Sequence, residues 1–283
     1  MEFRPLSPAI GSEVLGVAVD DIDDESFAAI RRTWAECGLL LLRGQSLDGP
    51  ALTRFSRRFG ELEAPPASER STRDGAGVDG APDVWLISNV IEDGKPIGSL
   101  GAGEAEWHTD MSYLETPPSA SLLFAREVPP AGGNTWFASM SAAAEALPDE
   151  LRAAVNGRRA RHDSSYTAAG DLRKGASEVT DARRTPGAEH PILRTHPETG
   201  RACLFLGRRR NGYIAGLELD RSEALLDRLW NFCTEPRFAY VHQWRAGDLL
   251  VWDNRSVIHR RDAFDANARR VMLRTQVKGD RPY

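Results

Sequence analysis

The 283-residue chain has few cysteines and no excess of positive charge. Cys37, Cys203 and Cys233 are odd in number and far apart, so they form neither a CxxC metal motif nor a disulfide framework. Acidic residues number 41 against 36 basic ones, whereas nucleic-acid-binding proteins are usually basic. No apolar run approaches the roughly 18–20 residues that span a bilayer. We therefore expect no nucleic acid and no membrane among the partners.

The sequence also lacks two kinds of short signal. Its N-terminus has no basic segment followed by an apolar one, which predicts that the protein is not secreted and stays cytoplasmic. Neither GxGxxG nor GxxxxGK[ST] is present, so no nucleotide-binding loop is indicated. Only three of the 36 basic residues are lysine, and arginine is therefore too common for its mere presence to mark a site.

Short strand patterns separated by turns make up most of the chain, with helices near the N-terminus and in a central insertion. Strands and helices do not alternate regularly, so a β-sandwich or jelly roll is favoured over a doubly wound α/β sheet. We expect one domain over residues 1–283, mainly β with helical insertions. The expected helices are 26–36, 50–59, 141–146, 148–155 and 222–232, and the expected strands are 38–42, 84–90, 120–128, 134–138, 202–206, 238–244, 248–252 and 269–277.

Two long polar segments, 64–82 and 163–190, show no helical or strand period. Structureless segments of this length inside a compact domain are usually lids or disordered loops. Their length alone leads to the hypothesis that they are lids over a binding site.

The tetrapeptide Trp107–Asp110 contains the most suggestive histidine. If the segment is extended, His108 and Asp110 project to the same side, about 6.6 Å apart along the strand. With a third neutral ligand they form the two-histidine, one-carboxylate triad of non-haem Fe(II) oxygenases. The tripeptide alone is weak evidence for a metal site, and by itself it favours a histidine that hydrogen-bonds a nearby acid at a strand edge.

A second group of candidates lies near the C-terminus. Residues 252–255 (WDNR) end an apolar strand, and His259 follows. In the last strand Arg270 and Arg274 alternate onto one face with Met272. Because a guanidinium matches a carboxylate in a bidentate way, this face can hold an anionic ligand beside a metal. A ladder of surface ion pairs is the alternative.

Taken together, these motifs resemble the taurine/chlorophenoxyacetate dioxygenase family. The resemblance extends over nearly the whole chain, including residues 55–60 and 190–197, with the motifs in the family's order. It is based on four features: WHTD at 107–110, GGNT at 132–135, WDNR at 252–255 with His259, and the pair Arg270 and Arg274.

The resemblance implies a double-stranded β-helix, which is a jelly-roll core, and a dioxygenase that uses Fe(II), O2 and 2-oxoglutarate as co-substrate. His108, Asp110 and His259 match the iron ligands. The implied reaction hydroxylates a small anionic substrate and releases succinate and CO2. Family members also suggest a homodimer or homotetramer.

The resemblance further implies roles for Thr135 and Arg270, which match the residues that bind the distal carboxylate of 2-oxoglutarate. Arg274 matches a second arginine near the substrate's anionic group. We also name His162 as a candidate substrate contact, because it follows a strand-like run just before the second polar segment.

Taurine is not the expected substrate. Taurine-using members add a histidine and a tyrosine from the loop before the first iron ligand, whereas here no histidine precedes His108 and the first tyrosine is Tyr113. A carboxylate on an aryl or alkyl body is favoured instead. A zinc-type metal-dependent hydrolase and an inactive ligand-binding jelly roll are the alternative functions.

Overall fold

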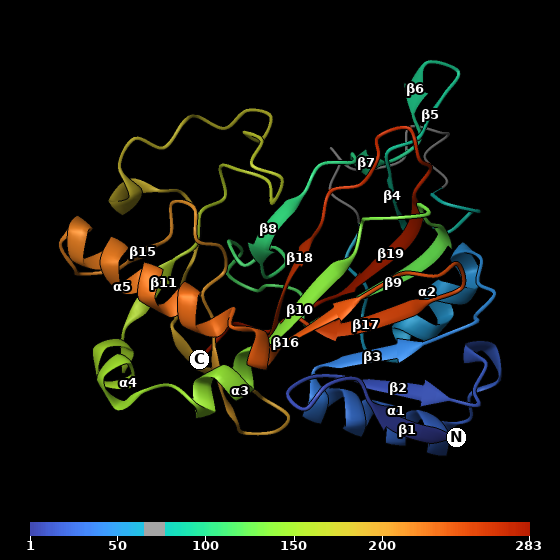
Figure 1. The fold of residues 1–283 in the computed structure, drawn as a ribbon, viewed down its shortest axis with the longest axis horizontal. Coiled ribbons are helices and arrows are strands. Elements are labelled where there is room, and N and C mark those ends of the chain that lie inside the picture. The colour runs from blue at the N-terminus through green and yellow to red at the C-terminus, as the bar shows by residue number, and fades with distance from the viewer. Residues whose placement is uncertain (65–76) are drawn as a thin grey trace.

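The computed structural model describes residues 1–64 and 77–283, so most of the first predicted lid, 64–82, lies outside the described residues. The larger of its sheets has eight strands, most of which pair antiparallel (Figure 1). In spatial order these are β1 (Glu2–Pro5), β2 (Ser12–Leu15), β3 (Leu39–Leu42), β17 (Leu249–Asp253), β9 (Ala120–Glu127), β19 (Val271–Val277), β4 (Trp85–Ser88) and β7 (Ser99–Leu100).

A second sheet has four antiparallel strands and carries much of the candidate site. A buried cluster with side chains from both sheets, including Leu123, Phe137 and Met272, fills the space between them. This two-sheet arrangement confirms the prediction of a mainly β, jelly-roll core. The strands of the second sheet are β16 (Ala239–His242), β10 (Thr135–Ser139), β18 (Val257–Arg261) and β8 (Ala105–His108).

The outer face of the larger sheet is covered by α1 (Asp24–Cys37) and α2 (Gly49–Arg57). Strand β3 is buried on both sides, with Leu39 and Leu41 between the sheets and Leu40 and Leu42 against the helices. A run of four leucines suits such a strand, because neither of its faces meets water. The two helices begin where Asp23 and Asp48 accept hydrogen bonds from backbone N–H groups, as N-caps do.

A third buried cluster lies in the central insertion, next to the three-stranded sheet formed by Arg159–Arg161, Glu189–Pro191 and Tyr213–Ile214 (Figure 1). It joins α3 (Met140–Glu145), α4 (Asp149–Val155) and α5 (Leu219–Cys233) to short strands. The short strands are β11 (Arg159–Arg161), β12 (Glu189–Pro191), β13 (Leu193–Thr195), β14 (Ala202–Leu204) and β15 (Tyr213–Ile214); β5 (Ile91–Glu92), β6 (Lys95–Pro96) and three 3-10 turns (Val19–Asp21, Ala182–Arg184, Pro236–Phe238) complete the elements.

The structure corrects three expectations. Strand β8 ends at His108 and the chain turns at Asp110, so the WHTD segment is not extended throughout. Helix α5 begins at Leu219, three residues before the predicted start, and Ser222 lies in its first turn, where the hydroxyl accepts a hydrogen bond from Ile214 N (2.9 Å). The predicted loop 163–190 contains a 3-10 turn and ends in β12.

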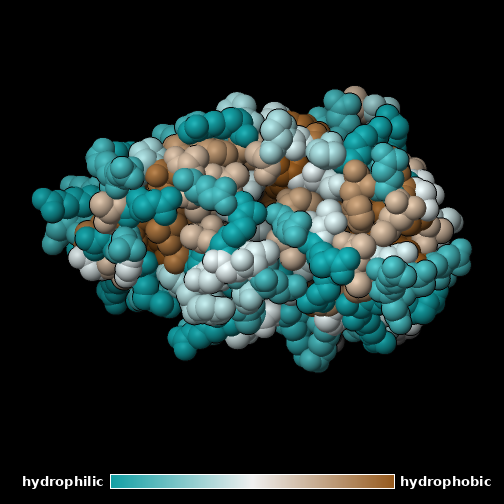
Figure 2. All heavy atoms as spheres, turned by 90° about the horizontal axis from the view of Figure 1, so that it is seen from below, coloured by the Kyte–Doolittle hydropathy of each residue, from teal (hydrophilic) through white to brown (hydrophobic). Residues whose placement is uncertain are grey.

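Hydrophilic side chains cover most of the face seen in Figure 2, and hydrophobic atoms show mainly in hollows between them. Within residues 1–64 and 77–283, no helix combines the length and the apolar character needed to cross a membrane.

Candidate metal centre and adjoining cavities

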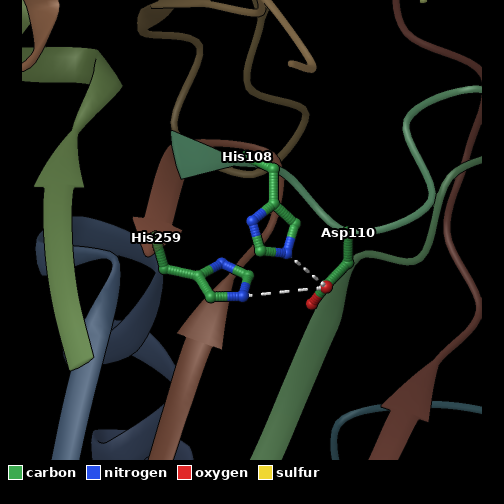
Figure 3. A group of neighbouring side chains, drawn as sticks. All are labelled: His108, Asp110 and His259. Carbon is green, nitrogen blue, oxygen red and sulfur yellow. Dashed lines mark ion pairs between the residues drawn. The ribbon is translucent and has the colours of Figure 1, made fainter. Parts of the chain in front are cut away.

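Three potential metal ligands meet between β8 and β18. His259 lies directly opposite His108 in the register of these strands, and Asp110 follows two residues later (Figure 3). The Asp110 Oδ1 atom lies 3.7 Å from His108 Nε2 and 3.8 Å from His259 Nε2. All three ligand atoms lie within 4.8 Å of one another. One ion can bond to all of them, since metal bonds to imidazole and carboxylate are about 2.1 Å long.

The turn after β8 is what directs both ligands to one side. Thr109 N donates to Gly207 O (2.9 Å), and the Thr109 hydroxyl donates to Val257 O (3.0 Å). The Thr109 side chain therefore ties β8 to β18 and leaves its two neighbours to face the centre. His108 Nδ1 lies 2.7 Å from Glu106 O, and donation to that carbonyl leaves Nε2 with a lone pair for a metal.

The protonation states suit a divalent cation. Burial lowers the pKa of His259 to about 4 and also lowers the pKa of His108, so both imidazoles are neutral at neutral pH. Burial by itself would raise the pKa of Asp110, but Arg274 and the two histidines hold that pKa well below its usual range. Two neutral imidazoles and one carboxylate form the facial triad that the sequence indicated.

Arg274 is buried and its Nη2 donates to Asp110 Oδ2, so its side chain does not belong to a surface ion-pair ladder. Ser121 Oγ donates to the same oxygen (2.7 Å). These bonds fix the carboxylate and leave its Oδ1 for the metal. The predicted substrate arginine thus has a carboxylate partner already, one that is itself a candidate ligand.

One cavity beside the triad contains the two residues that the resemblance linked to 2-oxoglutarate, Thr135 and Arg270. Thr135 is the first residue of β10, and its Oγ1 accepts a hydrogen bond from Trp244 Nε1 (2.9 Å). With its lone pair so engaged, the Thr135 hydroxyl is free to donate to a ligand oxygen. The first cavity is lined by Ile87, Ala105, His108, Leu123, Thr135, Ala168, Ala169, Trp252, His259, Arg261, Arg270 and Arg274.

Arg270 is only 2% exposed, and no acidic side chain among the described residues pairs with it. Burial, together with the charge of Arg261, lowers the pKa of Arg270 to about 9, which still leaves it cationic at neutral pH. Its guanidinium lies between the rings of Trp244 and Phe264, 6.0 and 5.9 Å from their centroids. A buried cation without a partner is costly, and a carboxylate in the cavity would remove that cost.

A second cavity adjoins the first and shares His108, Ala168 and Arg274 with it. Sequence reasoning did not single out its arginines, Arg173 and Arg208, because no local motif distinguishes them from the many others. The cavity is lined by Trp85, His108, Asp110, Met111, Tyr113, Thr167, Ala168, Arg173, Arg208, Arg274 and Gln276.

His162 lines neither cavity. Its ring is fully buried, stacked on Phe205 (centroids 5.3 Å apart) and edge-on to His190 (5.1 Å), and neither ring nitrogen has a hydrogen-bond partner among the residues that the structure describes. Burial lowers its pKa well below the usual value, which keeps this ring neutral. This placement favours a packing role for His162 over the substrate contact expected from the sequence.

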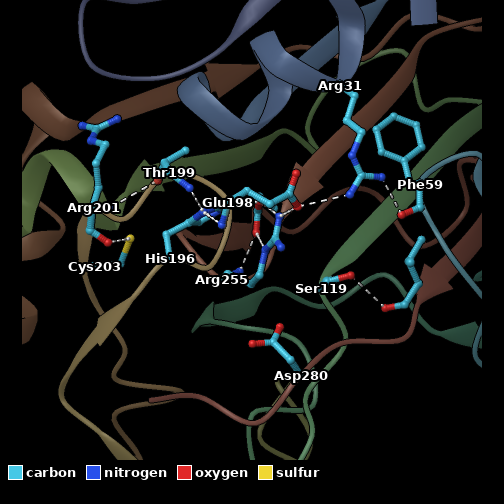
Figure 4. A network of polar contacts seen from close by, with 12 residues as sticks. Arg31, Phe59, Ser119, His196, Glu198, Thr199, Arg201, Cys203, Arg255 and Asp280 are labelled. Atoms are coloured by element: carbon cyan, nitrogen blue, oxygen red, sulfur yellow. Dashed lines mark hydrogen bonds and ion pairs between the residues drawn. The ribbon is translucent and has the colours of Figure 1, made fainter. Parts of the chain in front are cut away.

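The WDNR turn supports the strand that carries His259. Arg255 Nε and Nη2 donate to the two carboxylate oxygens of Asp253 (2.8 and 2.6 Å), and His196 Nε2 lies 3.0 Å from Oδ2. Glu198 extends the network by pairing with Arg255 (2.8 Å) and with Arg31 of α1 (3.3 Å), as Figure 4 shows. The turn between β17 and β18 is therefore held by buried ionic bonds.

We expect Asp253→Asn to lower the free energy of unfolding by about 3 kcal/mol. This value is at the low end of the cost of breaking a buried ion pair, because Arg255 retains its ion pair with Glu198. Chemical denaturation at neutral pH measures the loss. Burial alone would raise the pKa of Asp253, but Arg255 and His196 hold it well below its usual range. Its stabilisation is therefore present at neutral pH and is lost as the pH falls below about 4. Equal acid sensitivity in wild type and Asp253→Asn would contradict this assignment.

Comparisons with known proteins agree with this geometry. The model of the family described as "Taurine catabolism dioxygenase TauD, TfdA family" matches residues 2–276. The (S)-phenoxypropionate/alpha-ketoglutarate-dioxygenase of Delftia acidovorans is 33% identical over 99% of this chain and 95% of its own length. The 2,4-dichlorophenoxyacetate dioxygenase of Cupriavidus pinatubonensis is 33% identical over 98% and 97%. A taurine dioxygenase structure from Burkholderia xenovorans, 32% identical, covers 99% of this chain and 92% of its own, with a TM-score of 0.78.

Proposed function

This chain belongs to the TauD, TfdA family of 2-oxoglutarate-dependent dioxygenases, and from that premise we propose that it hydroxylates a small organic carboxylate. The observation that carries the proposal is the buried triad of His108, Asp110 and His259 next to a buried arginine, Arg270, that has no acidic partner within residues 1–64 and 77–283. We further propose that residues 1–283 form one catalytic domain.

We assign the metal to His108, Asp110 and His259, and the distal carboxylate of 2-oxoglutarate to Thr135 and Arg270. When bound, Fe(II) and 2-oxoglutarate activate O2, and oxidation of the oxoacid to succinate and CO2 accompanies insertion of one oxygen atom into a substrate C–H bond. The rest of the protein's contribution is binding, orientation and exclusion of water.

Particular residues account for the binding and the orientation. Arg274 and Ser121 hold one oxygen of Asp110 so that the other faces the metal. Trp244 orients the Thr135 hydroxyl toward the first cavity, where the positive charge of Arg270 favours the binding of a carboxylate. Because Arg270 is preorganised by burial, little has to rearrange when the oxoacid binds.

The segment 163–190 has the placement of a lid. It supplies Ala168 to both cavities, Ala169 to the first, and Thr167 and Arg173 to the second. We propose that this segment covers bound substrate and keeps water from the metal.

For the substrate, a carboxylate on an aryl or alkyl body is favoured over taurine. Two relatives are named for aryloxyalkanoates, (S)-phenoxypropionate and 2,4-dichlorophenoxyacetate. The second cavity offers Trp85 and Met111 to an apolar body. It lacks a histidine other than the metal ligand His108 within the described part of the chain.

We expect kcat/KM for aryloxyalkanoates to exceed that for taurine by at least tenfold. Each hydrogen-bonding partner that taurine-using relatives have and this chain lacks costs taurine about 1–3 kcal/mol. Succinate release from 2-oxoglutarate with Fe(II), across aryloxyalkanoates, sulfonates, alkyl sulfates and N-acyl amino acids, measures the ranking. Taurine as the best substrate would overturn the preference for carboxylates, and absence of substrate-dependent succinate release from the whole panel would overturn the proposed function.

We also propose a cytoplasmic protein that assembles as a homodimer or homotetramer. The reduced state of Cys37, Cys203 and Cys233 is compatible with that compartment. Light scattering of the purified protein measures the oligomeric state, and a monomeric mass would contradict the assembly.

A further inference from the structure

The second cavity carries positive charge that the described residues do not balance. Three arginines line it, Arg173, Arg208 and Arg274, against a single acidic residue, Asp110. Asp110 already accepts from Arg274 and faces the metal with its other oxygen. No described acidic side chain forms an ion pair with Arg173 or Arg208, although the charges of Asp163 and Glu106 act on Arg208 from nearby. Neither of those carboxylates lines the cavity, so both cations face it without a direct ion-pair partner among the described residues.

Arg208 is the more deeply buried of the two, at 7% exposure. Its backbone bridges to His108, which places it beside the metal centre. Its Nη1 donates to Tyr166 O (2.6 Å) and Thr167 O (2.8 Å), so the guanidinium is held in place by neutral carbonyls. Such bonds orient a cation but do not neutralise it, and the remaining charge favours an anionic ligand.

Arg173 lies in the lid segment and is only half-buried. Its Nε donates to Tyr166 O (3.2 Å), the same carbonyl that binds Arg208, and its guanidinium lies over the Tyr113 ring at 4.8 Å from the centroid. One backbone carbonyl therefore brings the two guanidinium groups together. Arg173 also lines an open surface hollow outside the cavity, which places it at the entrance.

We propose that Arg208 and Arg173 together form the site for the substrate's carboxylate, while Arg274 stays with Asp110. This inference rests on the proposed function and names the residues that recognise the substrate's carboxylate. The carboxylate then lies in the cavity that adjoins the 2-oxoglutarate cavity at His108. Because one of its two cations belongs to the segment 163–190, an anionic substrate also holds that segment over the metal.

The same cavity indicates the form of the rest of the substrate. Trp85 and Met111 offer apolar surface, and Gln276 and Thr167 are neutral. The Trp85 ring also packs against Arg274, whose guanidinium carbon is 5.5 Å from its centroid. A substrate with one anionic end and an uncharged aromatic or alkyl body fits this lining, and a second charge on that body finds no partner among the described residues.

Binding is tested without turnover, in protein loaded with Zn(II) and 2-oxoglutarate. Calorimetry compares (S)-2-phenoxypropionate with its neutral amide, 2-phenoxypropionamide. We expect the wild type to bind the acid more tightly, and Arg208→Gln to weaken acid binding by about 30-fold, the lower end for truncating a buried charge pair. Binding of the amide should stay unchanged, and Arg208→Lys should recover part of the affinity for the acid.

Arg173→Gln should weaken acid binding in the same direction by about fivefold, since an exposed pair is worth no more than about 1 kcal/mol. If Arg208→Gln does not fold, the affinity of Arg173→Gln for the acid tests the proposed carboxylate site instead. The matched control is Arg158→Gln, because Arg158 is exposed, donates to Ala154 O (2.9 Å) and lines neither cavity. Its Kd should equal that of the wild type.

The inference is wrong if Arg208→Gln and Arg173→Gln both bind the acid as the wild type does, or if the wild type does not prefer the acid to the amide. Failure of the proposed function gives a different result. Wild-type protein with Fe(II) would then release no succinate in response to the acid, even though its binding depends on Arg208.

Discussion

Replacing any one of His108, Asp110 and His259 with alanine is expected to abolish Fe(II)-dependent succinate formation. Each supplies one of three ligand atoms that converge on a single point. Loss of a residue that merely supports a ligand costs about 10–100-fold, so removal of a ligand should cost more than a hundredfold. Iron content after gel filtration measures the loss of metal binding, and succinate release measures the loss of activity.

Asp110→Ala should also unfold more easily than the histidine variants, because it leaves Arg274 buried without its carboxylate. Asp110→Asn keeps a hydrogen-bond acceptor for Arg274, and it separates the loss of the metal from the loss of stability. Asp149→Ala, on the exposed first turn of α4, is the matched control and should retain full activity. Near-native turnover by any single ligand variant would show that the metal lies elsewhere.

Arg270→Ala is expected to raise the KM for 2-oxoglutarate by roughly 30-fold to several thousandfold. Truncating one partner of a buried, hydrogen-bonded charge pair typically costs about 2–5 kcal/mol. Initial rates at varied 2-oxoglutarate measure the change. 2-Oxopentanoate, which has the same chain without the distal carboxylate, should be a poor substitute in the wild type and relatively better in Arg270→Ala.

The matched control for this variant is Arg269→Ala. Arg269 precedes Arg270 in the chain, but it lies on the surface and pairs with Glu127 and Glu92. Its loss should leave the KM for 2-oxoglutarate unchanged. An unchanged KM in Arg270→Ala would move the distal carboxylate to another donor, with Arg261 as the neighbouring guanidinium in the first cavity.

Strands β3 and β17 of the larger sheet could be predicted because their sequences are almost wholly apolar. Strand β3 reads Leu-Leu-Leu-Leu, and β17 has five buried residues in succession. Strands β8 and β18 were not predicted, although they carry His108 and His259. Both mix polar or charged residues with apolar ones, because part of each strand faces the cavity instead of a core.

The three candidate metal ligands, which the structure brings together, could be named from motif order and spacing, but their surroundings could not be predicted. The turn at Asp110 depends on hydrogen bonds from Thr109 to Gly207 and Val257, which are about 100 and 150 residues away in the chain. The approach of Arg208 and Arg173 to the triad depends on how the segment 163–190 crosses it. Contacts between residues so far apart in the chain leave no local pattern in the sequence.

The shared wall between the two cavities has a thermodynamic consequence. His108, Ala168 and Arg274 line both, so the two cavities share three residues of their walls. Any factor by which the oxoacid changes the affinity for the second ligand must be matched by the same factor in the reverse direction. Arg274 also binds Asp110, so under the proposed function the same reciprocity extends to the metal. We therefore expect the dissociation constants of metal, oxoacid and substrate to depend on one another, with Arg274 as the residue that all three sites share.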